Sequence, residues 1–131
     1  MYEVTILKLG DTIVVPIQVE LHDRAASQLQ EDVFKKIEQT GAKGLIIDVS
    51  AISIVDSFLG RLLGTTGKTA RMMGAETVLV GLKKEVVITL IELGISIDEL
   101  RTARTLEDGL ALLQALHLQV DHENGVSRHD T

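Results

Sequence analysis

The sequence predicts a single-domain α/β protein in which about four helices cover a mixed sheet of four to five strands. Runs of branched apolar residues alternate with segments of helical periodicity along the 131 residues, in the order ββαβαβαβα. The hydrophobic fraction of 45% and the charged fraction of 24% are typical of a globular domain with a sizeable core. No linker-like stretch divides the chain, so we expect one domain over residues 1–117 and a flexible polar tail over 118–131.

The composition excludes several classes of function. A formal net charge of −6 disfavours general binding to nucleic acid and to anionic membrane surfaces. The absence of cysteine excludes disulfides, thiol catalysis and zinc–thiolate sites, and an aromatic fraction of 2% excludes a stacking platform for single-stranded nucleic acid. We find no apolar run of about 20 residues and no signal-peptide pattern, so we expect a cytoplasmic protein.

The chain opens with a predicted β-hairpin. Two apolar runs, at residues 4–9 and 12–19, flank the turn-forming pair Gly10–Asp11. Pro16 cannot donate a ladder hydrogen bond, which predicts that its strand lies at an edge of the sheet or carries a bulge.

Helices and strands then alternate to the end of the domain. Asp23 is the predicted N-cap of the first helix, and Thr105 with Asp108 forms a start resembling a capping box for the last one. The apolar spacing of the last helix lapses after Leu118. The expected helices cover residues 23–40, 57–73, 85–93 and 105–118, and the expected strands cover 44–49, 77–80 and 100–103.

Two of the predicted helices carry residues that one buried stripe does not explain. The run 86–91 is apolar on more than one side, which indicates either full burial within the domain or a subunit interface. Gly60, Gly64 and Gly67 would each cost about 1 kcal/mol relative to Ala in a helix interior. We therefore expect close packing at these glycines, against the sheet or against a neighbouring protomer, and packing inside the domain is the favoured alternative.

The centre of the chain resembles the signature of the STAS domain. The stretch G-L-I-I-D-V-S-A-I-S-I-V-D-S-F runs from Gly44 to Phe58, and residues 90–95 and 105–110 are similar to later parts of the same pattern. The resemblance extends from about residue 4 to residue 116. It implies the fold of the anti-anti-sigma factors and of the C-terminal parts of anion transporters.

Within that family the chain is most similar to the RsbS-type scaffolds of the bacterial stressosome. The residues that carry this similarity are P-I-Q-V-E-L-H-D at 16–23 and V-D-S-F at 55–58. The resemblance implies a cytoplasmic bacterial protein that joins RsbR-like STAS paralogues in a large pseudo-icosahedral complex. Such scaffolds hold an RsbT-like serine kinase and release it when one serine, here Ser57, is phosphorylated. RsbR-type relatives carry a phosphorylatable threonine where Asp23 stands, which favours the RsbS subgroup.

The position of Ser57 suits such a switch. At the predicted N-cap of a helix, a phosphate would face unpaired backbone N–H groups and the positive end of the helix dipole. It would add about −1.5 to −2 charges beside Asp56, and Arg61 lies on the same helical face. Asp56 either orients the serine and helps the kinase recognise it, or caps backbone N–H groups. Phe58 and Asp23 are the other two residues that we expect to support recognition of Ser57 by the kinase.

Catalysis and cofactor binding by this chain are not expected. Gly64–Thr69 is similar to a phosphate loop, but Leu62 stands where that motif needs glycine, and the segment has helical periodicity. We therefore expect no cofactor, with ATP bound by the partner kinase, and no metal site. Asp48, at the end of a buried strand, is interpreted as a loop anchor.

Two rival functions remain. An anti-anti-sigma factor would share the fold and bind an anti-sigma kinase as a small monomer or dimer, so particle size separates it from a scaffold. A small serine hydrolase using Ser57 would need a histidine base and the glycines of a nucleophile elbow. Three of the histidines lie at or beyond the end of the last predicted helix, and those glycines are missing. The histidines are His22, His117, His122 and His129.

Overall fold

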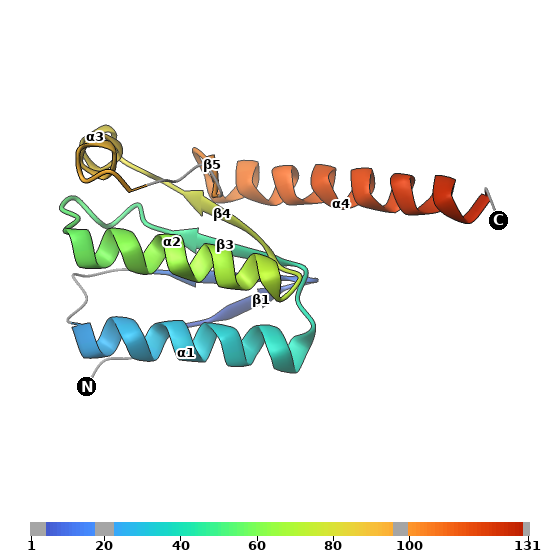
Figure 1. Cartoon of the computed structure of the whole chain (residues 1–131), viewed down its shortest axis with the longest axis horizontal. Helices are drawn as coiled ribbons and strands as arrows, with labels where there is room; N and C mark the ends of the chain where they lie inside the picture. Colours follow the sequence, from blue (N-terminus) through green and yellow to red (C-terminus); the bar gives the residue numbers. More distant parts are fainter. Residues whose placement is uncertain (1–4, 18–22, 96–99, 130–131) are drawn as a thin grey trace.

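A computed structural model describes residues 5–17, 23–95 and 100–129, excepting the side chains of 118–129. These residues form a five-stranded mixed sheet, in the strand order β1-β2-β3-β4-β5, with four helices (Figure 1). The elements are β1 (Leu7–Leu9), β2 (Thr12–Pro16), α1 (Asp23–Thr40), β3 (Gly44–Asp48), α2 (Ser57–Met72), β4 (Glu76–Val80), α3 (Lys84–Glu92), β5 (Arg101–Ala103) and α4 (Leu106–His129). The predicted fold class and element order are confirmed.

The sheet brings the ends of its central strands to one edge. β1 runs antiparallel to β2 through a turn in which Gly10 has a φ of 60°, while β2, β3, β4 and β5 are mutually parallel. The carboxyl ends of the parallel strands therefore meet at the same edge. There, the Val49 N–H donates to the Val80 carbonyl at 3.0 Å. The segments that follow β3 and β4 consequently lie next to each other.

Pro16 occupies a different position from the one expected. The sequence predicts that its strand lies at an edge or carries a bulge. β2 lies between β1 and β3, so the first alternative is wrong, and the paired residues of β2 match those of β1 and β3 one to one, without a bulge. The pairing with β1 reaches only Val14, and on the other side the Ile17 N–H donates to the Asp48 carbonyl at 2.9 Å. The nitrogen of Pro16 thus faces the side where the neighbouring strand has already ended, and no donor is needed there.

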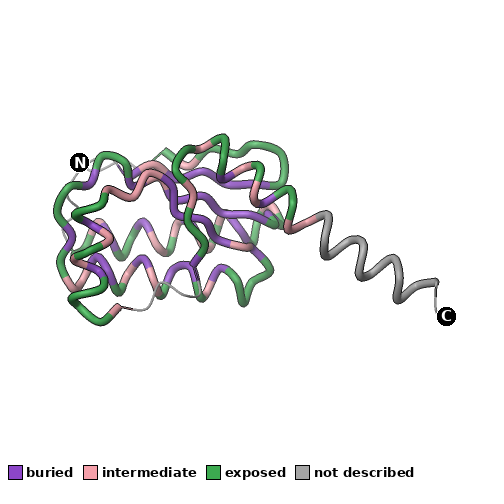
Figure 2. The backbone as a smooth tube through the Cα atoms, turned by 90° about the horizontal axis from the view of Figure 1, so that it is seen from above, coloured by how far each residue is buried: buried purple, intermediate pink, exposed green. Residues whose placement is uncertain are grey.

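Apolar residues pack on both faces of the sheet. In Figure 2 the buried residues follow the strands and recur at intervals along the helices. The larger core includes side chains of α1, α2 and α3, whereas α4 covers β3, β4 and β5 on the other face. Members of the larger core include Ile13, Leu45, Leu79, Val33, Leu63 and Leu90, and the smaller core contains Val14, Ile46, Val78, Val80 and Leu113. α2 is thereby fixed along its buried side.

α3 is only partly buried. Val86 and Leu90 are buried, but Ile88 is 46% exposed and Ile91 is 66% exposed. Full burial within the domain, one of the two expectations for this helix, is therefore wrong. The described residues supply no element over its outer side.

α4 begins as expected but runs further. The Asp108 N–H donates to the Thr105 hydroxyl oxygen at 3.1 Å, which confirms the predicted cap. The helix continues to His129, past Leu118, because no proline interrupts this segment and a helix can continue after its apolar stripe has ended. The boundary between domain and tail at residue 117 stays a prediction. No helix in the described part of the chain is long and apolar enough to cross a membrane.

Candidate functional site

A well-anchored loop leads from β3 into α2. The Asp48 carboxylate accepts a hydrogen bond from the Ser50 N–H at 2.9 Å, as expected of a loop anchor. Ile52 and Val55 are buried, whereas Ile54 between them is 71% exposed. The two buried side chains hold the loop against the core and fix the direction in which the chain enters α2.

The segment after β4 supports this loop from the side. Gly81 has a φ of 79°, and a Cβ atom at this position would lie 2.7 Å from the Cβ of Ser50. Glycine is therefore required both by the backbone conformation and by the close approach. Two residues further, the Lys83 ammonium donates a hydrogen bond to the Ser53 hydroxyl oxygen at 3.0 Å. The entry to α2 is thus supported by a second connection.

Asp56, not Ser57, is the N-cap of α2. Its backbone is extended, with φ −101° and ψ 177°, and its carboxylate accepts the Leu59 N–H at 2.8 Å. Ser57 is the first helical residue, so the prediction that Ser57 caps the helix is wrong. Both residue types cap well, so residue type alone does not distinguish the two positions. The capping alternative for Asp56 is therefore the one that the structure shows.

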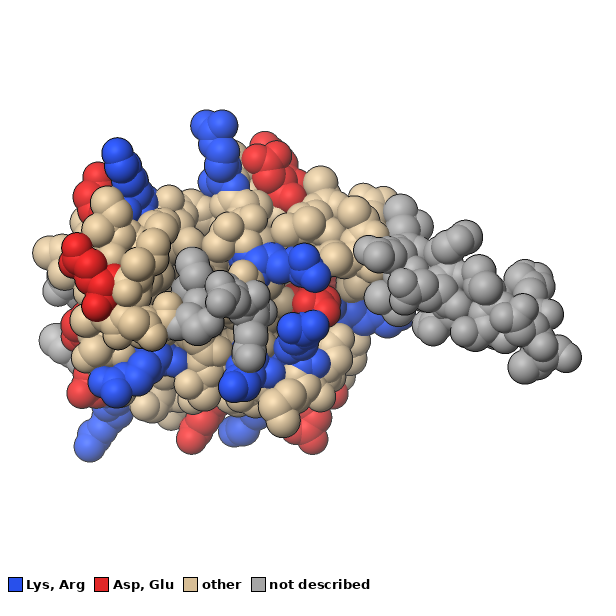
Figure 3. Space-filling view, turned by 45° about the horizontal axis from the view of Figure 1, so that its top comes forward, with Lys and Arg blue, Asp and Glu red and all other residues tan. Residues whose placement is uncertain are grey.

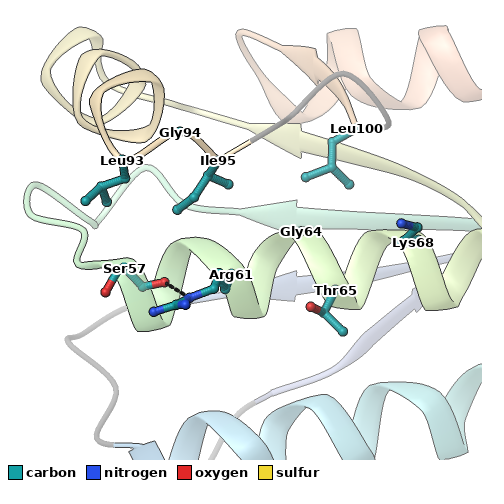
Figure 4. Close-up of a pocket in the computed structure, with 9 residues that line it drawn as sticks. All are labelled: Ser57, Arg61, Gly64, Thr65, Lys68, Leu93, Gly94, Ile95 and Leu100. Atoms are coloured by element: carbon teal, nitrogen blue, oxygen red, sulfur yellow. Dashed lines mark hydrogen bonds between the residues drawn. The ribbon is translucent and has the colours of Figure 1, made fainter.

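The Ser57 hydroxyl has no structural hydrogen bond among the described residues. The side chain is half-buried in the first turn of α2, and Phe58 beside it is also half-buried. Arg61 lies one turn on, where its Nε–H donates to the Ser57 carbonyl at 3.2 Å (Figure 4). This bond holds the guanidinium next to the first turn. A phosphate on Ser57 would meet Arg61 and the positive end of the helix dipole.

Ser57 stands at one end of a hollow beside α2. Polar and small residues on successive turns of α2 form one wall, and mainly apolar residues after α3 form the other (Figure 4). The volume of the hollow is about 630 Å³. The lining residues are Ser57, Arg61, Gly64, Thr65 and Lys68 on α2, with Leu93, Gly94, Ile95 and Leu100 opposite. Sequence reasoning did not identify this hollow. The spacing of its polar residues along α2 was the available signal.

The glycines of α2 divide into two kinds. A Cβ atom at Gly60 would overlap the Cδ1 of Ile95, and one at Gly67 would overlap a Cδ atom of Leu100. Close packing within the domain is therefore confirmed at these two positions. At Gly64 a Cβ atom would meet nothing within 4 Å, so the same expectation is wrong there. The phosphate-loop-like segment that begins at Gly64 lies inside the helix, as expected.

The remaining predicted residues make no hydrogen bond with Ser57 in the described part of the chain. Asp23 is the exposed first residue of α1 rather than its N-cap, because the helix already includes it. It lies at the same end of the molecule as the start of α2 (Figure 1), but no hydrogen bond joins it to Ser57 in the described residues. His117 contacts the Lys43 carbonyl at 3.1 Å. Lys43 precedes β3 whereas Ser57 follows it, so His117 lies at the opposite edge of the sheet. His22 and the side chains of His122 and His129 lie outside the described residues.

Comparisons with known proteins agree on one family. The family model described as the STAS domain matches residues 3–109. RsbRA of Bacillus subtilis, described as an RsbT co-antagonist protein, is 23% identical over 97 residues, which are 74% of this chain. The aligned part is only 35% of the length of RsbRA.

Two solved structures are more similar. A serine-to-glutamate variant of RsbS from Moorella thermoacetica is 38% identical with a TM-score of 0.80, and the alignment covers 88% of this chain and 98% of the variant. A chain from a structure titled as the molecular architecture of the stressosome, a signal integration and transduction hub, is 40% identical with a TM-score of 0.78. That alignment covers 86% of this chain and 98% of the other.

Proposed function

Because the chain belongs to the STAS-domain family, we propose that it is a non-enzymatic scaffold of the RsbS type. It associates with copies of itself and with RsbR-like paralogues in a large complex in the bacterial cytoplasm. It holds an RsbT-like serine kinase, which binds the ATP, and releases that kinase when Ser57 is phosphorylated. The similarity to a stressosome chain over nearly its whole length supports this proposal.

One observation carries the proposed site. Asp56 caps α2, so the neighbouring Ser57 hydroxyl is not needed to hold the helix start together. A phosphate can therefore be added to Ser57 without removing a hydrogen bond on which the fold depends. It changes the local charge by about −1.5 to −2 beside Arg61 and the exposed Asp56. Such a change releases a docked partner while the domain stays folded.

The test uses two hydroxyls in the same hollow. Wild type, Ser57→Ala and Thr65→Ala are each bound to the candidate RsbT-like kinase, and ATP is added. We expect Ser57→Ala to keep the kinase bound, because it has lost the acceptor oxygen. Thr65→Ala, a matched loss of a hydroxyl two turns further along α2, should release the kinase as wild type does.

The measurements are kinase retention after gel filtration and mapping of the phosphorylated residue by mass spectrometry. Normal release from Ser57→Ala would contradict the proposal. So would phosphorylation at Thr65 or Ser50 with none at Ser57.

A further inference from the structure

The loop between β3 and α2 exposes one large apolar side chain shortly before Ser57. Ile54 is 71% exposed, whereas Ile52 and Val55, which precede and follow it in the loop, are buried. These two buried residues already hold the loop against the core, so the outward side chain of Ile54 adds little to the stability of the domain. Single exposed apolar residues are common on protein surfaces, so the location of this one is its informative property.

The backbone on both sides of Ile54 is held in place. On one side, the Lys83 ammonium donates a hydrogen bond to the Ser53 hydroxyl oxygen at 3.0 Å. On the other side, the Asp56 carboxylate accepts the Leu59 N–H at 2.8 Å and fixes the first turn of α2. Ile54 therefore projects from a preformed loop, and burying its side chain against a partner requires little further ordering of the backbone.

Ile54 and Ser57 are close enough to be covered by one partner. Three residues of fully extended chain span at most about 11 Å, so the Cα atoms of these two residues are no further apart than this. Leu93, at the C-terminal end of α3, is 42% exposed and lines the same hollow as Ser57 (Figure 4). A protein that reaches the Ser57 hydroxyl therefore finds exposed apolar side chains both on the loop and at the end of α3.

Charge offers less to a docking partner. On the face of the molecule that Figure 3 shows, acidic and basic side chains are interspersed, so no large field of one sign is present there to direct docking. Burial of apolar side chains is the main source of affinity in most protein interfaces, and a few residues supply most of it. An exposed apolar side chain beside the proposed phosphorylation site is suited to that role.

We propose that Ile54 is a docking residue for the serine kinase, and that its side chain enters an apolar recess on the kinase while Ser57 lies in the kinase active site. This inference rests on the proposed function, because it assigns one contact by which the proposed kinase is held. A second copy of the chain is a less suitable occupant, since a copy seated this close to Ser57 would cover the serine that the kinase must reach.

The test measures kinase binding by isothermal titration calorimetry without ATP, for wild type, Ile54→Ser and Ile54→Leu. We expect Ile54→Ser to raise the Kd about tenfold or more, because it replaces the docking side chain by a small polar one. Ile54→Leu keeps an apolar side chain of the same size and should bind within about threefold of wild type.

A kinetic measurement separates docking from positioning of the reacting hydroxyl. With ATP present, the initial rate of Ser57 phosphorylation is measured over a range of concentrations of the chain. Ile54 contacts the kinase equally before and during phosphoryl transfer, so Ile54→Ser should raise the KM about tenfold and leave the kcat within about twofold of wild type.

Met72→Ser is the matched control. Met72 is 81% exposed and is the last residue of α2, about 22 Å along the helix axis from Ser57. This variant loses an equally exposed apolar side chain far from the serine, so it should bind the kinase and be phosphorylated as wild type is. Circular dichroism verifies that each variant is folded.

Wild-type affinity in Ile54→Ser, an equal loss of affinity in Met72→Ser, or a lower kcat at unchanged KM would overturn the inference. So would a loss of self-association by Ile54→Ser in sedimentation velocity without kinase, because it would assign this side chain to a contact between copies. A wild-type chain that does not bind the kinase would overturn the proposed function as well. Kinase retention by Ser57→Ala after addition of ATP uses a different variant and decides the proposed function separately.

Discussion

On the buried side of α2, Gly60 and Gly67 lie directly against Ile95 and Leu100, whereas Gly64 on the outer side faces open space. The three glycines are alike in sequence and differ only in their surroundings. The first two permit the segment between α3 and β5 to approach the helix closely. The third leaves a recess among polar side chains. One side of the helix thus holds the domain together while the other side is available for contacts with other molecules.

The largest difference between the two sides should appear when side chains are truncated. Leu63 is buried in the larger core, so Leu63→Ala is expected to lower the free energy of unfolding by about 2–5 kcal/mol. Thr65→Ala, two residues further on the exposed side, should change it by less than about 0.5 kcal/mol. Urea denaturation followed by circular dichroism measures both. Similar effects for the two variants would mean that the sides are not distinct.

A matched pair of glycine substitutions sharpens the comparison. Both Gly67→Ala and Gly64→Ala place a residue of higher helix propensity in a helix interior. This contribution to the free energy of unfolding is the same in both variants, so it cancels when they are compared. Only Gly67→Ala forces a Cβ atom against Leu100. We expect Gly67→Ala to be less stable than Gly64→Ala by about 1–3 kcal/mol, the usual cost of overpacking. Gly64→Ala alone should raise the free energy of unfolding by up to about 1 kcal/mol.

If the two glycine variants were equally stable, the Leu100 side chain would be able to move aside without lowering the free energy of unfolding. The same denaturation curves supply this measurement, provided that the dependence of the unfolding free energy on denaturant is unchanged between the variants.

The smallest expected effect on the free energy of unfolding concerns the N-cap of α2, which is common to the buried and the exposed side of the helix. Asp56→Ala removes the oxygen that accepts the Leu59 N–H and should lower the free energy of unfolding by about 1 kcal/mol. Asp56→Asn keeps a side-chain oxygen and should retain most of the stability. Thermal and urea unfolding of the two variants measure the difference. If Asp56→Ala were as stable as Asp56→Asn, the cap would not depend on this oxygen.

The elements of the fold could be predicted because their signals are local. The branched apolar run at Gly44–Asp48 and the helical spacing from Ser57 onward each identify an element without knowledge of its neighbours. The choice between Asp56 and Ser57 as N-cap was not local in this way. Two good capping residues stand side by side, and residue type alone does not tell which one has the extended backbone of an N-cap.

What covers an element could not be predicted from its own residues. The apolar content of α3 was evident, but the exposure of Ile88 and Ile91 depends on the lack of a covering element among the described residues. The hollow beside α2 is likewise formed by segments about thirty residues apart in the sequence, whose meeting depends on the packing of the whole domain. The phosphorylation of Ser57 was predicted from resemblance and stays a prediction.

The position of Pro16 has a consequence for the outermost strand. β1 contains three residues, all exposed, and it pairs only with Thr12, Ile13 and Val14. If β1 separated from the sheet, β2 would become the edge strand, and the nitrogen of Pro16 could not donate a hydrogen bond to an incoming strand. β2 would therefore be a poor template for adding a strand from another chain, which protects the domain against amyloid-like growth at this edge.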